Sequence, residues 1–162
     1  MAIAVEFLGI AALGSGSVPA THPGKPGVAR RAGERVMELV KSGLKPREIM
    51  TRAGLENAIA SVAATGGSTN AVLHLLAIAR EAGVELALAD FDRISSRTPV
   101  YADLKPSGRF VANDLFNAGG GALVAQRLAN ARLIDATAKT VDRKSTRLNS
   151  SHIQKSRMPS SA

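Results

Sequence analysis

A run of small and aliphatic residues, interrupted once by paired glycines, constrains the fold of this chain more than any other feature. Residues 55–83 read LENAIASVAATGGSTNAVLHLLAIAREAG. On both sides of Gly66 and Gly67, apolar side chains recur every three or four positions, which is the spacing of one helix face. We therefore predict two packed helices joined by a tight turn. The first begins after Thr51 and ends at the glycines, and the second covers residues 70–82.

The rest of the chain up to residue 142 alternates helix patterns with turns rich in glycine and proline. Further helices are predicted over residues 2–12, 26–42, 46–50, 91–97 and 113–133, the last broken at Gly119 to Gly121. Asp90 is expected to cap the helix at 91–97. Two short strands are predicted, VELAL at 84–88 and VYADL at 100–104. This alternation, without an internal repeat or a linker, predicts one domain of helices with two short strands over residues 1–142.

Basic residues are concentrated at the end of the chain. The net charge of +8 would by itself favour a nucleic acid as partner. However, residues 143–162 contain five of the 21 Lys and Arg residues and no acid, so residues 1–142 hold 16 basic against 13 acidic side chains. The sequence therefore predicts no nucleic-acid partner for the domain. Because residues 143–162 lack apolar periodicity, we expect them to be a disordered tail.

The apolar segments are too short to cross a membrane. No apolar run reaches the roughly 20 residues that a membrane span needs. The apolar start of the chain lacks a basic leading segment and is interrupted by Glu6, which is not the pattern of a signal peptide. We therefore expect a cytoplasmic protein that has no membrane partner.

The turn GGSTN, residues 66–70, has two interpretations. The start of a helix leaves backbone N–H groups free, and with the hydroxyls of Ser68 and Thr69 they would suit a carboxylate or a phosphate. Alternatively, Ser68 or Thr69 caps the helix, and the glycines only permit a tight turn. Capping is the commoner role of such residues, and it is the favoured interpretation.

Other candidate side chains do not form a catalytic pair or a metal site. The chain has no cysteine. His74 lies one turn into its helix without a second ligand at a useful spacing, so we expect a packed core residue. In DLKPSGRF, residues 103–110, Asp103 is expected to pair with Lys105 or Arg109 around a solvated turn. The chemistry of the side chains alone predicts no reaction.

Several segments, taken in their order, resemble the dihydroxy-acid dehydratase and phosphogluconate dehydratase family. They are EFLGI, GSGSVPA, LENAIASVAATGGSTNAVLHLLAIAREAGV, DFDRIS, ADLKPSGRF and DLFNAGG. The resemblance covers nearly all of residues 1–142. Within the family, the chain looks most like the dihydroxy-acid dehydratases of branched-chain amino-acid biosynthesis, the route to valine and isoleucine.

The resemblance implies a hydro-lyase that converts a 2,3-dihydroxy acid to a 2-keto acid. This chain would be the helix-rich, incomplete part of a three-layer α/β N-terminal domain. The full-length enzyme would carry an iron–sulfur cluster on three cysteines and a Mg²⁺ ion, and it would form a homo-oligomer. Resemblance also implies that the active site is lined near Gly66, Gly67, Ser68, Thr69 and Asn70, without making these residues catalytic.

The chain departs from the family pattern at both ends. The family's third cluster cysteine lies in a segment of the form Cys-Gly-x-Met-x-Thr-Ala-Asn-x-Met, and Met1 resembles the last residue of that segment. The other cysteines, the magnesium ligands and a serine base would also lie outside. We therefore expect an internal fragment that is inactive alone, with no catalytic or metal-ligating residue. Residues 143–162 resemble translated cloning or adapter DNA.

Three alternatives remain open at this point. One is a fragment of a sugar-acid dehydratase from the same family. Another is a small basic nucleic-acid-binding protein, which requires that residues 143–162 belong to the functional chain. The last is a helical scaffold or interaction module, which requires that residues 1–142 fold alone.

Overall fold

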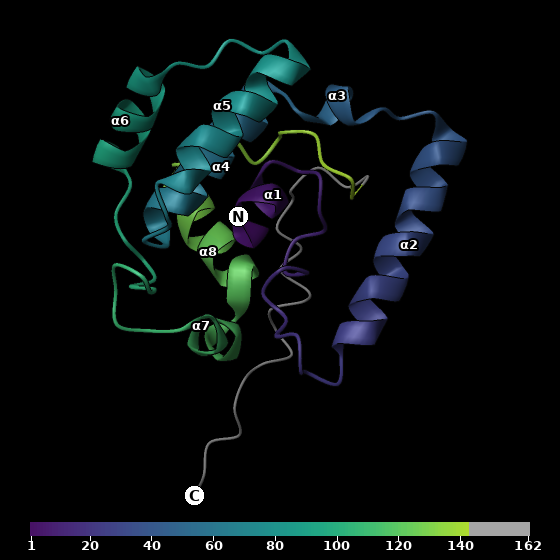
Figure 1. Ribbon diagram of the computed structural model, residues 1–162, viewed down its shortest axis with the longest axis horizontal. Helices are drawn as coiled ribbons and strands as arrows, with labels where there is room; N and C mark the ends of the chain where they lie inside the picture. Colours follow the sequence, from purple (N-terminus) through teal and green to yellow (C-terminus); the bar gives the residue numbers. More distant parts are fainter. Residues whose placement is uncertain (143–162) are drawn as a thin grey trace, which may run out of the picture.

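The computed structural model describes residues 1–142 (Figure 1). They form eight helices and no named strand: α1 (Ala2–Phe7), α2 (Lys25–Ser42), α3 (Pro46–Ile49), α4 (Arg52–Ala64), α5 (Asn70–Ala82), α6 (Leu88–Arg97), α7 (Ala112–Ala118) and α8 (Gly120–Asn130). The prediction of a disordered, foreign tail at 143–162 lies outside the described residues. None of the described helices is both long and apolar enough to cross a membrane.

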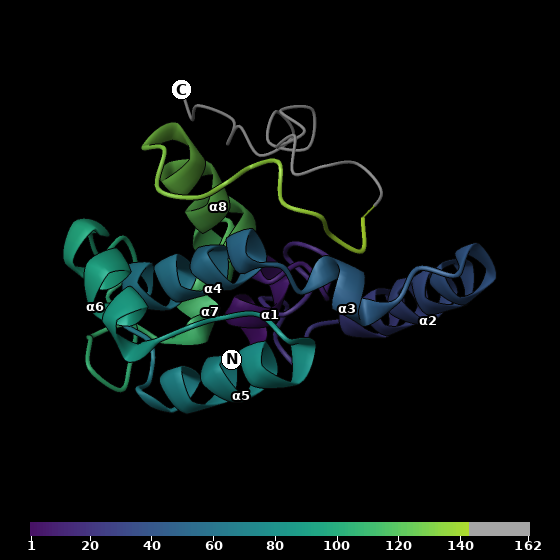
Figure 2. The ribbon, with the colours of Figure 1, turned by 90° about the horizontal axis from the view of Figure 1, so that it is seen from above.

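Helix α4 lies at the centre of the molecule. Helices α1, α5, α6 and α8 all pack against it (Figures 1 and 2). Its residues Leu55, Ala58, Ala60 and Ala64 have no exposed surface. A helix that is small or apolar on every side belongs in the interior, and its small side chains let neighbouring helices approach closely. The run that dominates the sequence is therefore the central element of the fold.

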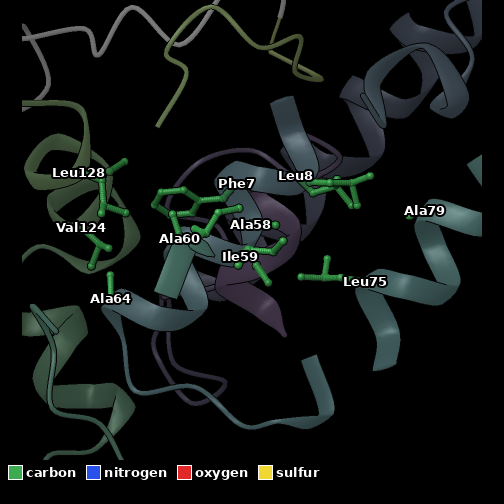
Figure 3. Packing of buried hydrophobic residues seen from close by; sticks show 14 of the residues in the cluster. Phe7, Leu8, Ala58, Ile59, Ala60, Ala64, Leu75, Ala79, Val124 and Leu128 are labelled. Carbon is green, nitrogen blue, oxygen red and sulfur yellow. The ribbon is translucent and has the colours of Figure 1, made fainter. Parts of the chain in front are cut away.

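The core forms where four helices converge on α4. Figure 3 shows Ala58, Ile59 and Ala60 between surrounding side chains, among them Phe7 of α1, Leu8 just after it, Leu75 of α5, and Val124 and Leu128 of α8. Leu8, Leu55, Leu75, Ile94 and Leu128 are the largest apolar side chains with no exposed surface. Three of these side chains come from outer helices: Leu75 from α5, Ile94 from α6 and Leu128 from α8. The core is therefore shared by segments far apart in sequence.

Local capping signals fix most helix ends as the sequence predicts. The Thr51 hydroxyl accepts a hydrogen bond from the Gly54 amide at 3.2 Å at the start of α4. Helix α5 ends at Gly83, whose φ of 71° is a conformation that glycine adopts without strain. The break predicted at Gly119 to Gly121 is confirmed, because α7 ends at Ala118 and α8 begins at Gly120.

The predicted first helix is too long. Helix α1 ends at Phe7 rather than at residue 12. Gly9 turns the chain with a φ of 92°, and a side chain there would begin 2.5 Å from the Lys139 carbonyl oxygen. The Gly9 carbonyl in turn accepts a hydrogen bond from the Val141 amide at 2.7 Å. The helix therefore ends at a glycine turn, where the Ile10 amide donates to the Val5 carbonyl. The contact of this turn with residues 139–141 has no local sequence signal.

Both predicted strands are wrong. Residues 84–87 have no regular structure, and Leu88 is already the first residue of α6. In the segment 100–104, the structure has only an isolated bridge between Leu104 and Phe110. A strand needs a partner along its length for its backbone N–H and C=O groups. Within residues 1–142, the segment 84–88 has no bridge partner and 100–104 has only this single bridge. Short apolar runs are thus insufficient to make strands here.

Helix α2 is present as predicted, but its apolar face is not covered. No residue of α2 is buried. Val36, Met37 and Val40 expose 56%, 56% and 68% of their surface. Both ribbon views show α2 standing apart from the helices that surround α4 (Figures 1 and 2). A groove of about 830 Å³ separates it from residues 10–18. The helix is therefore held mainly at its ends and through Arg35, whose guanidinium donates to the Val141 carbonyl.

Candidate functional site

The turn 66–70 joins α4 to α5 at the surface. Gly66 has a φ of 62°, which allows the chain to reverse sharply. The Ser68 hydroxyl accepts a hydrogen bond from the Asn70 amide at 3.2 Å, and the next two amides donate to backbone carbonyls of the turn. The Thr69 side chain makes no capping hydrogen bond. The first-turn N–H groups are thus satisfied within the turn, which favours capping, by Ser68 rather than Thr69, over anion binding.

The structure brings the loop 103–110 against this turn. The Ser107 hydroxyl donates to the Gly66 carbonyl at 2.9 Å. The Ala102 amide, at the start of the loop, donates to the Ala64 carbonyl at 3.0 Å. Two motifs that are well separated in sequence therefore form one surface corner, which we call the 66/107 corner after its joining residues. Sequence reasoning identified both motifs but gave no sign that they meet.

The charges of the loop are paired at the surface. Arg109 Nε lies 2.7 Å from Asp103 Oδ2, with 81% of the Arg109 side chain exposed. The guanidinium also lies 5.4 Å from the centre of the Phe110 ring. The predicted pairing of Asp103 is therefore confirmed for Arg109, and no ion pair is recorded for Lys105 within the described residues. Pairing leaves Arg109 only weakly held, because such exposed pairs contribute little.

A hollow of about 600 Å³ lies on the other side of the segment 100–104. Its wall is apolar except for a few charged and polar side chains: Tyr101, Asp103, Arg109, Asp114 and Arg127. Asp114 is already used, because its carboxylate accepts the Val111 amide at 2.9 Å at the start of α7. The hollow therefore combines an apolar surface with Arg127 and with Arg109, which is paired with Asp103.

His74 does not lie in the core, so the prediction of a packed histidine is wrong. Helix α5 buries Ala71, Leu75 and Ala79, which follow one another at four-residue spacing. His74 lies one position before Leu75, about 100° away around the helix, and it is exposed. The apolar residues around it in sequence did not distinguish the face of α5 that packs from the face that remains open.

Asp90 forms ion pairs that the sequence did not predict. It was predicted to cap a helix, and its Oδ2 does accept the Ala87 amide at 2.9 Å, two residues after α6 begins. Its other oxygen binds Arg52 of α4 and, at 3.1 Å, Arg93. The Arg52 hydrogen bond holds the pKa of Asp90 well below its usual range. This ion-pair cluster, completed by Glu56, joins two helices and makes no cavity, so its role is structural.

Comparison with known proteins identifies the family. Residues 1–149 match the family model described as "Dihydroxy-acid/6-phosphogluconate dehydratase N-terminal". The chain belongs to this dehydratase family. Dihydroxy-acid dehydratases from Koribacter versatilis, Roseiflexus sp. and Thermus thermophilus are 61%, 53% and 52% identical to it over 141 residues. Each alignment covers 87% of this chain and 25% of the relative, so the chain spans about a quarter of their length.

The residues of this dehydratase chain do not fit an iron–sulfur cluster, because the sequence contains no cysteine to supply thiolates. Within residues 1–142, no group of three His, Asp or Glu side chains is placed to hold a metal ion. The 66/107 corner is the candidate region on the surface of this dehydratase chain.

Proposed function

We propose that this chain is a fragment of the N-terminal domain of a dihydroxy-acid dehydratase. The complete enzyme would remove water from a 2,3-dihydroxy acid and give a 2-keto acid, in the biosynthesis of valine and isoleucine. The observation that carries the proposal is the match of residues 1–149 to the N-terminal family. Relatives named dihydroxy-acid dehydratase at 50–61% identity favour this substrate class over a sugar acid.

We propose that the 66/107 corner lines the substrate site and does not perform its acid–base chemistry. Gly66, Gly67, Ser68, Thr69 and Asn70 include no side chain that titrates near neutral pH. The Ser107 hydroxyl donates to the Gly66 carbonyl and so closes the corner, and the Gly67, Ala71 and Val72 amides donate to backbone carbonyls. Gly67 through Asn70 are exposed, so they are accessible to a ligand. Such a surface can shape and orient a substrate.

Further properties are proposed for the complete enzyme only. It would contain an iron–sulfur cluster and Mg²⁺, both held by residues outside this chain. The described helices would form the helix-rich part of a three-layer α/β domain, and the enzyme would be a cytoplasmic homo-oligomer. On this proposal the isolated chain has no dehydratase activity, because the metal ligands and the base are elsewhere.

The proposal is tested by transplanting this chain into a complete relative. The 141 residues of this chain that align with the Koribacter versatilis enzyme replace their counterparts in it. Formation of 2-keto acid from a branched 2,3-dihydroxy acid is then measured. We expect activity within about tenfold of the recipient, since 61% of the residues are already identical. Preference for a sugar acid would favour the alternative substrate. A chimaera that folds and retains its cofactors but dehydrates neither substrate contradicts the proposal.

The nucleic-acid alternative is tested on the chain itself. A basic chain binds DNA or RNA with an affinity that falls steeply as salt rises. We expect the chain ending at residue 142 to show no such binding, because it is close to neutral. Retention of strong, salt-dependent binding by this shortened chain would support a nucleic-acid function instead.

A further inference from the structure

Glu6 is the most deeply buried acidic side chain among the described residues, with 3% of its surface exposed. It projects from α1 into the segment 14–17. Its Oε2 accepts the Gly14 amide at 2.7 Å, and its Oε1 accepts the Gly16 amide at 2.6 Å. Both oxygens of one carboxylate are thus used to hold a loop whose residues lie eight and ten positions away.

The same segment is also bonded to the start of α8. The Ser17 hydroxyl accepts the Gly121 amide at 2.7 Å in a buried hydrogen bond. A β-carbon at Gly121 would lie 2.6 Å from Glu6 Oε2, and one at Gly16 would lie 2.8 Å from Oε1. The carboxylate therefore fits closely between two glycines. Helix α1, the segment 14–17 and the first turn of α8 all meet at it.

Few charged groups act on this carboxylate. Lys25, at the start of α2, attracts it and donates to carbonyls of the loop. The loop's own His22 packs against α7 instead. On α4, Arg52 and Glu56 are engaged with each other and with α6. The first turn of α8 has no titratable side chain. Burial raises the pKa of Glu6, and the loop amides and Lys25 offset this only partly.

We propose that Glu6 is a proton-controlled latch on the loop between α1 and α2. The ionised carboxylate holds the Gly14 and Gly16 amides together. A proton taken up from solvent binds one carboxyl oxygen, and the amide facing that oxygen loses its acceptor. The loop then loosens from α1 and from the first turn of α8. Because Lys25 also bonds to this loop, the start of α2 loosens with it.

The test follows the amide resonances of Gly14 and Gly16 in the ¹⁵N-labelled 162-residue chain between pH 3 and pH 8. We expect both to shift through one midpoint above the ordinary glutamate pKa of about 4.3. Hydrogen-exchange protection of these amides, corrected for intrinsic exchange, should fall about tenfold below that midpoint. The Leu55 amide, bonded to Thr51 within α4, should keep its protection. Midpoints at the ordinary value, or amides that do not titrate, overturn the proposal.

A matched pair of variants separates the latch from a general effect. Glu6→Gln replaces one of the two accepting oxygens with an NH₂ group, which cannot accept a hydrogen bond. The Gly14 and Gly16 amide resonances should therefore stop titrating, and the hydrogen-exchange protection of these amides should be lower at pH 7. Glu34→Gln removes a carboxylate with 63% of its side chain exposed and should leave the Gly14 and Gly16 behaviour unchanged. The latch would be refuted if, at pH 7, the Gly14 and Gly16 amides of the Glu6→Gln variant were as protected from hydrogen exchange as those of the original chain. If Glu6→Gln does not fold, the titration of the original chain decides alone.

Discussion

Leu75 gives a direct test of how α5 is attached to the fold. It has no exposed surface and points from α5 toward Ile59 of α4 (Figure 3). Replacement by alanine removes three carbon atoms from the buried cluster. Surrounding side chains relax only partly after such a change, so a cavity should remain. We expect Leu75→Ala to lower the free energy of unfolding by about 3 kcal/mol, within the range of 2–5 for such changes.

The control is the same substitution two residues away. Leu73 exposes 68% of its surface, so Leu73→Ala should change the free energy of unfolding by less than about 0.5 kcal/mol. Urea unfolding followed by helical circular dichroism measures both. With a slope of about 1–3 kcal/mol per M, Leu75→Ala should lower the midpoint by about 1–3 M, and Leu73→Ala should barely move it.

Leu75→Val covers the case in which the alanine variant does not fold. It removes one carbon and should cost roughly 1 kcal/mol. Equal shifts for the two alanine variants, or a larger shift for Leu73→Ala, would refute the packing of α5 through the Leu75 face.

Three further predictions concern helix ends, the ion-pair cluster and α2. Thr51→Ala should cost about 1 kcal/mol in urea unfolding because it removes a cap, whereas Thr69→Ala, whose hydroxyl caps nothing, should cost much less. Arg52 lowers the pKa of Asp90, so ionised Asp90 stabilises the fold above about pH 4 and loses this effect as pH falls. Asp90→Asn should therefore cost about 1 kcal/mol at pH 7, with a difference that narrows in acid; a constant difference would contradict the assignment. Val40→Glu should reduce self-association in light scattering without moving the unfolding midpoint, since Val40 is exposed.

Local signals in the sequence predicted the central helices well. The Thr51 cap and the glycines around residues 66 and 83 act on the nearest turn of backbone, so their effect follows from the residue types. The same holds for the break between α7 and α8. The spacing of Leu55, Ala58, Ile59 and Val62 predicted a helix with one apolar face at α4, but it did not identify the helices that surround it.

The predictions that failed depend on contacts between residues that are distant in sequence. VELAL has the composition of a strand, but strand formation depends on a neighbouring strand. His74 lies in a helix that is apolar on several faces, and only packing shows that Leu75 is on the buried one. The corner between Gly66 and Ser107 depends in the same way on a long-range contact.

The hydrogen bond between the Val141 amide and the Gly9 carbonyl has a consequence for recombining homologous genes. It places the two ends of the segment 9–141 side by side. Helix α1 must be inherited together with this segment, because it packs against α4. Crossovers placed before α1 and after residue 141 would take this packing and the closing hydrogen bond from one parent, whereas crossovers within α4 would divide side chains that pack together. Shuffled libraries of these dehydratases should therefore yield more folded members when their boundaries lie outside residues 2–141.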